Sequence, residues 1–117
     1  MKTGKTMKRI FKIERYVNYL ITKSVIALHE EGYIYDFLLD EVGQLWAIQE
    51  RRPYLFTEIN INKISKFDDH DGKAIKFMVA IETVDGLKGI LLSARLNQDF
   101  LNYIKDDVKS EMLQLAY

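Results

Sequence analysis

The chain contains no cysteine, one proline and six glycines among its 117 residues. The absence of cysteine excludes disulfides, thiolate catalysis and cysteine metal sites. The 17 basic and 17 acidic side chains leave no formal net charge, so charge gives no argument for a nucleic acid or a membrane as partner. No apolar run approaches the length of a membrane span, and the N-terminus lacks the apolar part of a signal peptide. We therefore expect a cytoplasmic protein.

A chain of this length fits one domain and can bury an ordinary core without disulfides. Residues 1–12 form a basic arm with five lysines or arginines and no acid, which is typical of a solubilising terminus. A nucleic-acid accessory protein that binds through this arm is a less favoured alternative. We expect residues 13–117 to form a single α+β domain.

Helical periodicity predicts a helix at each end of the domain. The first runs from about residue 13 to 31, and Gly32 follows it as the capping glycine that a left-handed backbone requires. The second begins after Asn97, a natural N-cap. The apolar stripe of the first helix is Val17, Leu20, Ile21, Val25 and Leu28, and that of the second is Phe100, Leu101, Ile104, Val108, Met112 and Leu115.

Alternating apolar and polar residues predict strands between the helices. The segments 33–39 and 44–49 read as two strands joined by a turn at 40–43, and the second strand is interrupted before Pro53. A third strand covers 56–67, where the alternation slips in a way that predicts a β-bulge near Asn62-Lys63.

The clearest local signal is a hairpin between residues 73 and 96 with Asp85-Gly86 at its turn. A two-residue loop would place Ile81 opposite Ile90 and Val79 opposite Leu92. The resulting apolar face is predicted to pack under the first helix; it consists of Phe77, Val79, Ile81, Ile90 and Leu92. The opposite face would pair Ala80 with Leu91 and Met78 with Ser93.

Together these elements predict an α+β fold, an antiparallel four- to five-stranded meander with an N-terminal and a C-terminal helix packed on it. The second hairpin face is too apolar to meet water, so we expect the C-terminal helix to cover it, either in its own chain or in a partner. An exchange between two chains would give a homodimer. The interface candidates are Met78, Leu91, Ile104, Val108 and Met112.

Few residues suggest chemistry. Arg51 and Arg52, near Tyr35 and Trp46 if the first two strands pair, could bind a carboxylate, a phosphate or a base. An edge strand protected by charge and proline is the favoured interpretation of this arginine pair. The acidic loop from Asp68 to Gly72 reads as a solvated turn, because it lacks the spacing of a calcium loop. No catalytic residue, metal site or cofactor is predicted, since no nucleophile has a partner set.

The middle of the chain resembles a family of small uncharacterised bacterial proteins often labelled phosphoribosylpyrophosphate synthetase. The matching segments are Glu31 to Phe37, Phe56 to Asp69 and Val79 to Leu92, about half of the chain. The motifs are structural, so the resemblance speaks to fold more than to activity. The chain contains no glycine-rich loop that could present consecutive N–H groups to a phosphate, and we expect no synthesis of phosphoribosylpyrophosphate.

The sequence favours a non-enzymatic binding or interaction module that pairs with itself and binds a further protein or small molecule. The alternative is a small enzyme that binds a phosphoribosyl or nucleotide ligand through Arg51 and Arg52. A concave site with convergent polar groups would favour the enzyme, and a flat apolar patch would favour the module.

Overall fold

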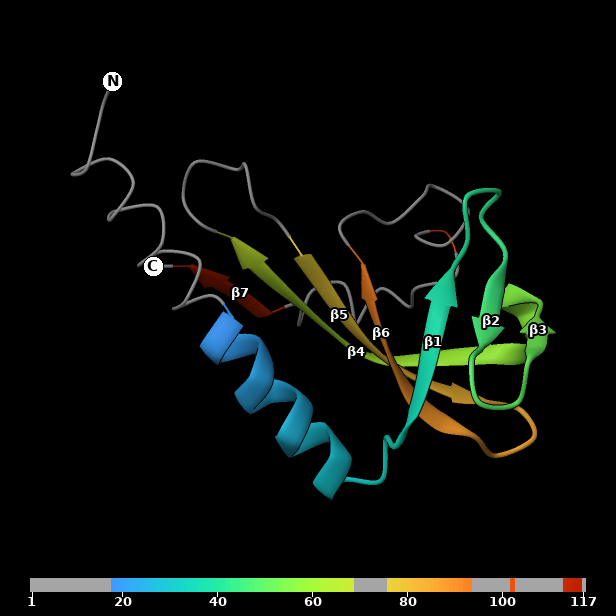
Figure 1. The fold of residues 1–117 in the computed structure, drawn as a ribbon, viewed down its shortest axis with the longest axis horizontal. Coiled ribbons are helices and arrows are strands. Elements are labelled where there is room, and N and C mark those ends of the chain that lie inside the picture. The colour runs from blue at the N-terminus through green and yellow to red at the C-terminus, as the bar shows by residue number, and fades with distance from the viewer. Residues whose placement is uncertain (1–17, 69–75, 94–101, 103–112, 117) are drawn as a thin grey trace.

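A computed structural model describes residues 18–68, 76–93, 102 and 113–116 of the chain. These residues form an α+β fold in which a helix, described over 18–30, packs on a seven-stranded mixed sheet (Figure 1). The strand order is β3-β2-β1-β6-β5-β4-β7. The strands are β1 (Tyr35–Leu39), β2 (Leu45–Ala47), β3 (Arg52–Tyr54), β4 (Ile59–Asp68), β5 (Lys76–Thr83), β6 (Lys88–Ser93) and β7 (Leu113–Ala116), and a 3₁₀ turn, η1 (Phe56–Glu58), precedes β4.

The end of the helix is as predicted. Gly32 has φ +98°, the Tyr33 N–H donates to the Leu28 carbonyl at 3.0 Å, and the Gly32 N–H donates to the His29 carbonyl at 3.0 Å. This pair of hydrogen bonds satisfies carbonyls that the last helical turn leaves free, and it needs a left-handed residue that glycine supplies cheaply. His29 itself is exposed in the last turn.

The first hairpin is also close to its prediction. β1 and β2 pair antiparallel, with Leu38 opposite Trp46, around a turn in which the Asp40 carboxylate accepts the N–H groups of Val42 and Gln44. The second strand ends before Pro53, as predicted, but Arg52–Tyr54 then forms a further strand, β3, that was not predicted. β3 lies at the edge of the sheet, where proline is tolerated, and Trp46 faces Pro53.

The predicted bulge is confirmed in β4. Ile61 pairs with Ile81 and Lys63 pairs with Ala80, so Asn62 is an extra residue in the ladder. Its side-chain amide donates to the Tyr33 hydroxyl at 2.9 Å and to a Glu82 carboxylate oxygen at 3.2 Å. A bulge re-aims the residues that follow it, and this one moves Lys63 to the sheet face opposite Ile61.

The predicted register of the main hairpin is wrong by one residue. Val79 lies opposite Leu91 and Ile81 opposite Gly89. The loop has three residues, 84–86, because the Thr83 N–H donates to the Leu87 carbonyl at 2.8 Å and Gly86, with φ +99°, takes the left-handed position at its end. The predicted apolar face is therefore divided between the two sides of the sheet.

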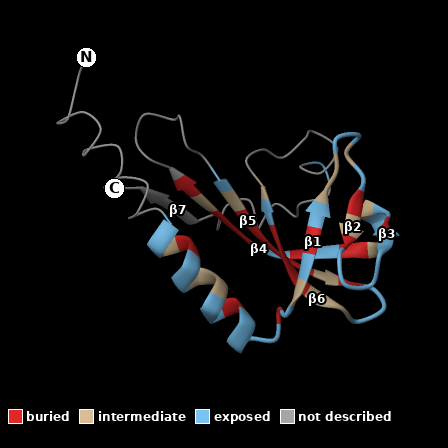
Figure 2. Cartoon of the chain, viewed as in Figure 1, coloured by how far each residue is buried: buried red, intermediate tan, exposed pale blue. Residues whose placement is uncertain are grey.

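The helix was predicted to cover the hairpin face with Phe77, Val79 and Ile81, but it covers the opposite face. Phe77, Val79 and Ile81 face away from it, and both faces of β5 are apolar and covered (Figure 2). The cluster under the helix joins Ile21, Leu28, Tyr33, Phe67, Met78, Ala80 and Ile90. The inner cluster, on the opposite face, joins Phe37, Leu45, Ala47, Tyr54, Ile59, Ile61, Ile64, Val79, Ile81 and Leu91.

The sheet is not the antiparallel meander that was predicted, because β1 pairs parallel with β6 and β4 pairs parallel with β7. It is also strongly curled. Five strand spacings separate β3 from β4 in the strand order, about 24 Å in a flat sheet. The five residue steps from Tyr54 to Ile59 span at most about 18 Å, so the sheet must bend to bring the two strands together. The inner cluster fills the concave side.

Part of the C-terminal prediction is also corrected. Leu115 was assigned to a helix, but Leu113–Ala116 forms β7, paired with β4 from Ser65 to Asp68. Residues 97–101 and 103–112 of the predicted helix lie outside the described residues, as do the basic arm 1–12 and residues 69–72 of the acidic loop. Among the residues that are described, no helix is long and apolar enough to cross a membrane.

Candidate functional site

The four predicted ligand-binding residues do not meet in one site. Arg52 lies opposite Ala47 and Trp46 opposite Pro53, so Arg52 and Trp46 belong to opposite faces of the sheet. Tyr35 pairs with Gly89 at the start of β1. Arg51 is exposed in the β2–β3 turn with φ +51°, the only positive φ of a residue other than glycine in the described chain.

Arg52 is part of a polar network around Asp85 at the tip of the main hairpin. Its guanidinium lies 2.6 Å from the Asp85 carboxylate and stacks 4.5 Å from the centre of the Tyr54 ring. The buried Tyr54 hydroxyl donates to the same carboxylate at 3.0 Å, and the Thr83 hydroxyl donates to it at 2.5 Å. The network links β3 to the β5–β6 turn and so holds the sheet in its curled form.

The network shifts the pKa values of two side chains, Asp85 and Tyr54. The hydrogen bond from Thr83, with smaller contributions from Tyr54 and Arg52, lowers the pKa of the Asp85 carboxyl below its ordinary value. Burial raises the pKa of the Tyr54 phenol, and its bond to Asp85 acts in the same direction. Since Arg52 is already bound on two sides, the network reads as a structural clasp rather than a phosphate site.

An apolar row lies on the face of the sheet that carries the helix, on the strands beside it. Leu38 of β1 faces Trp46 of β2, which faces Pro53 of β3. Leu92 of β6 adjoins Leu38, since the residues before them, Leu91 and Phe37, are paired. Leu38 is 50% exposed and Leu92 44% exposed. The helix packs over β4, β5 and β6 and leaves this row uncovered by any described residue.

The Trp46 ring is held in place from one side. Its indole N–H donates to the Asp40 carboxylate at 2.9 Å, and this hydrogen bond is the main cause that lowers the pKa of Asp40. Asp36 and Gln49 close the opposite end of the first hairpin: the Gln49 amide donates to the Asp36 carboxylate at 2.6 Å, and the Asp36 N–H donates back to the Gln49 amide oxygen at 2.9 Å. The row thus has an apolar centre and a fixed polar rim.

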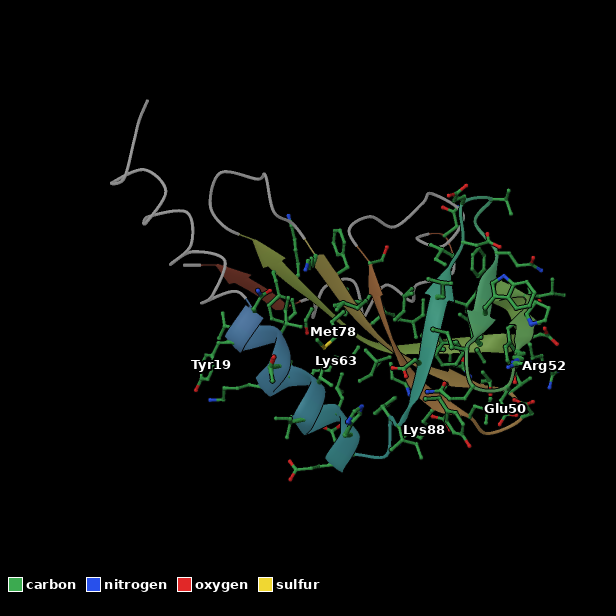
Figure 3. All side chains as sticks on the ribbon, viewed as in Figure 1. Tyr19, Glu50, Arg52, Lys63, Met78 and Lys88 are labelled. Carbon is green, nitrogen blue, oxygen red and sulfur yellow. The ribbon has the colours of Figure 1, made fainter. Side chains whose placement is uncertain are left out.

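A pocket of about 80 Å³ lies between the second half of the helix and strands β4 and β5. Its floor is Met78 and Ala80, and Ser65 contributes a hydroxyl from β4. Lys63 and Glu31 stand at its edge, both exposed. Figure 3 shows Lys63 and Met78 in the space between helix and sheet. The remaining lining residues are Ser24, Ala27 and Leu28.

The interface candidates are divided by the structure. Met78 lies under the helix and Leu91 in the inner cluster, and both are fully buried in the chain. Ile104, Val108 and Met112 lie outside the described residues, so their part in an interface stays a prediction. Within the described ranges no group of three or more histidine, aspartate or glutamate side chains could hold a metal ion.

Sequence reasoning missed both the exposed row and the pocket. Leu38 and Trp46 were visible as strand residues, but which face the helix would leave open depends on long-range pairing. The pocket had one local signal: the bulge at Asn62, which was predicted and which determines the face on which Lys63 lies.

Comparison with family models, with curated proteins and with solved structures finds no match to this chain.

Proposed function

We propose that this chain is a protein-interaction module that forms a two-fold homodimer through the apolar row Leu92, Leu38, Trp46 and Pro53. The observation that carries the proposal is the exposure of Leu38 and Leu92 in one continuous row across four strands. Contiguous exposed apolar surface with a polar rim is typical of protein–protein contacts.

A second copy is the occupant that the charges favour. The row itself carries no charged side chain, so a two-fold axis through it brings no like charges together at its centre. The chain as a whole has no formal net charge, which removes both repulsion between copies and attraction to a highly charged partner. Pro53 interrupts the hydrogen-bonding edge of β3, which disfavours association of two copies through that edge. The face of the sheet then remains as the surface for association.

The alternative, a phosphoribosyl- or nucleotide-related enzyme acting through Arg51 and Arg52, gains no support from the site. The guanidinium of Arg52 is shared between Asp85 and Tyr54, and the 80 Å³ pocket lies on the other side of the sheet from Arg52 and is small for a nucleotide, whose sites run to several hundred Å³. The family resemblance and the cytoplasmic location stay predictions.

Sedimentation equilibrium of the full chain tests the dimer. We expect a concentration-dependent monomer–dimer equilibrium that Leu38→Glu weakens by about tenfold or more, because it places a charge in the centre of the row. Val84→Glu is the matched control, since Val84 is a 67% exposed apolar residue in the β5–β6 turn, away from the row. A chain that stays monomeric at every concentration, or that loses association equally in both variants, contradicts the proposal.

A further inference from the structure

The pocket under the helix contains a buried hydroxyl with no hydrogen-bond partner among the residues that the structure describes. Ser65 is only 7% exposed, it lines the pocket, and among the described residues its side chain makes no hydrogen bond. A buried hydroxyl without a partner is destabilising, and native proteins satisfy nearly all such groups. Its position at the wall of a cavity provides room for a group that would bind it.

Two opposite charges flank this hydroxyl. Lys63 stands on the β4 side of the pocket and Glu31 on the helix side, and neither forms an ion pair within the described chain, where the one ion pair joins Arg52 and Asp85. A simple anion would be attracted by Lys63 but repelled by Glu31, and a simple cation would meet the reverse. A small molecule that carries both charges satisfies both side chains.

The bulge in β4 makes this arrangement. In an unbroken ladder Lys63 would share the face of Ile61 and point into the inner cluster. The extra residue, Asn62, shifts Lys63 to the helix side, and Asn62 is held there by the Tyr33 hydroxyl and the Glu82 carboxylate. Bulges next to binding sites commonly re-aim a side chain in this way.

We propose that this pocket binds a small zwitterion of the α-amino acid class. The ligand carboxylate meets Lys63, its ammonium group meets Glu31, and a polar atom bonds the Ser65 hydroxyl. The apolar floor of Met78 and Ala80 accepts the α-carbon and a short side chain. The enclosed volume of about 80 Å³ is about half of the 150 Å³ cavity that accommodates benzene. With the two charged groups of the ligand at the exposed rim beside Lys63 and Glu31, this volume has room for the α-carbon and a side chain no larger than a methyl group, so glycine and alanine fit and leucine does not. The site shares no residue with the dimer row, so this proposal does not depend on the proposed dimer.

The test is a titration of the isotope-labelled full chain followed by heteronuclear NMR. The probes are glycine, L-alanine, L-leucine, acetate and methylammonium. We expect saturable shifts at amides of residues 24–31, 63–65 and 78–80 with glycine and L-alanine. Acetate and methylammonium, which each carry one charge, should bind about tenfold more weakly or worse, and L-leucine should not saturate.

Three variants assign the contacts: Lys63→Met, Glu31→Gln and Ser65→Val. Each should weaken glycine binding by about fivefold or more. The first two replace exposed side chains, so the fold survives even if Ser65→Val proves unstable. The controls are Lys66→Met, on the opposite face of the same strand, and Glu30→Gln, the helix neighbour that does not line the pocket. The proposal is overturned if no probe saturates, if acetate or methylammonium binds as tightly as glycine, or if Lys63→Met and Glu31→Gln leave glycine binding unchanged.

Discussion

The Lys88 ammonium group lies 4.3 Å from the centre of the Tyr33 ring, on the strand side of the helix terminus. From this position it also donates to the Glu31 carbonyl at 3.0 Å, one of the carbonyls that the end of the helix leaves without an internal partner. One lysine of β6 therefore joins the helix end, the following aromatic residue and the centre of the sheet.

Removing this lysine should loosen the helix. Lys88→Met keeps the aliphatic stem but loses the hydrogen bond and the contact with the ring, and we expect a loss of about 1–2 kcal/mol in the free energy of unfolding. Chemical denaturation measures it. Lys66→Met, a half-buried lysine of β4 on the other face, should change stability by less than about 0.5 kcal/mol. Equal effects of the two substitutions would show that the helix-end contact contributes nothing.

Gly89 tests the strand pairing. A Cβ atom at this position would lie 2.4 Å from the backbone oxygen of Tyr35, because β1 runs parallel beside β6 at this point. Neither backbone can yield cheaply, so Gly89→Ala should destabilise the protein by about 1–3 kcal/mol. Gly86→Asn is the comparison, since nothing lies within 4 Å of a Cβ at Gly86 and its only cost is the backbone strain of a side chain at φ +99°, so we expect a smaller loss of stability there than in Gly89→Ala. A Gly89→Ala variant that melts with the parent would contradict the parallel pairing.

The Asp85 network predicts an acid-sensitive component of stability. The pKa of Asp85 in the folded chain lies below its unfolded value, so its contribution is complete above the unfolded pKa of about 4 and is lost as the pH falls through the folded pKa. Asp85→Asn should flatten this part of the profile in denaturation midpoints measured across acidic pH. Glu41→Gln, at an exposed residue of the first turn, should leave it unchanged. A profile unaltered by Asp85→Asn would refute the assignment.

Features determined by residues close together in the sequence were predicted, and features determined by contacts between distant residues were not. Gly32, the turn after Asp40 and the bulge at Asn62 were predicted correctly, because neighbouring residues in the chain determine them. The hairpin register was not. Asp85-Gly86 favours a two-residue loop, but the Thr83 hydroxyl accepts the Leu87 N–H at 2.9 Å and binds Asp85, which stabilises a loop one residue longer.

The parallel pairs and the candidate sites were beyond a local reading. Nothing near Tyr35 in the sequence indicates that it will lie beside Gly89, and Arg52 meets Asp85 across 33 positions of the chain. The hairpin face that was predicted to need a cover from the C-terminal helix, with Met78 and Ala80, is covered by the first helix instead. The exposed row begins at Leu92 of the hairpin and continues through Leu38 of β1 and Trp46 of β2, and this continuation depends on long-range strand pairing.

The purified protein should not make phosphoribosylpyrophosphate. The chain lacks a glycine-rich loop that could cradle a phosphate, and Arg52 is bound within the protein. Incubation with ribose 5-phosphate, ATP and magnesium should release no AMP above that of a heat-inactivated sample. Magnesium-dependent AMP production at an ordinary enzymatic rate would establish the synthetase activity and refute this prediction.

The proposed dimer joins two copies of the chain through the row on β6, β1, β2 and β3. The absence of cysteine makes a direct measurement possible, because a single introduced cysteine is the only thiol. Leu38→Cys places a thiol in the row, and Val84→Cys places one in the exposed β5–β6 turn. Under mild oxidation we expect a disulfide-linked dimer for Leu38→Cys at concentrations where Val84→Cys stays monomeric. Equal cross-linking of the two variants, or none in Leu38→Cys, would contradict it.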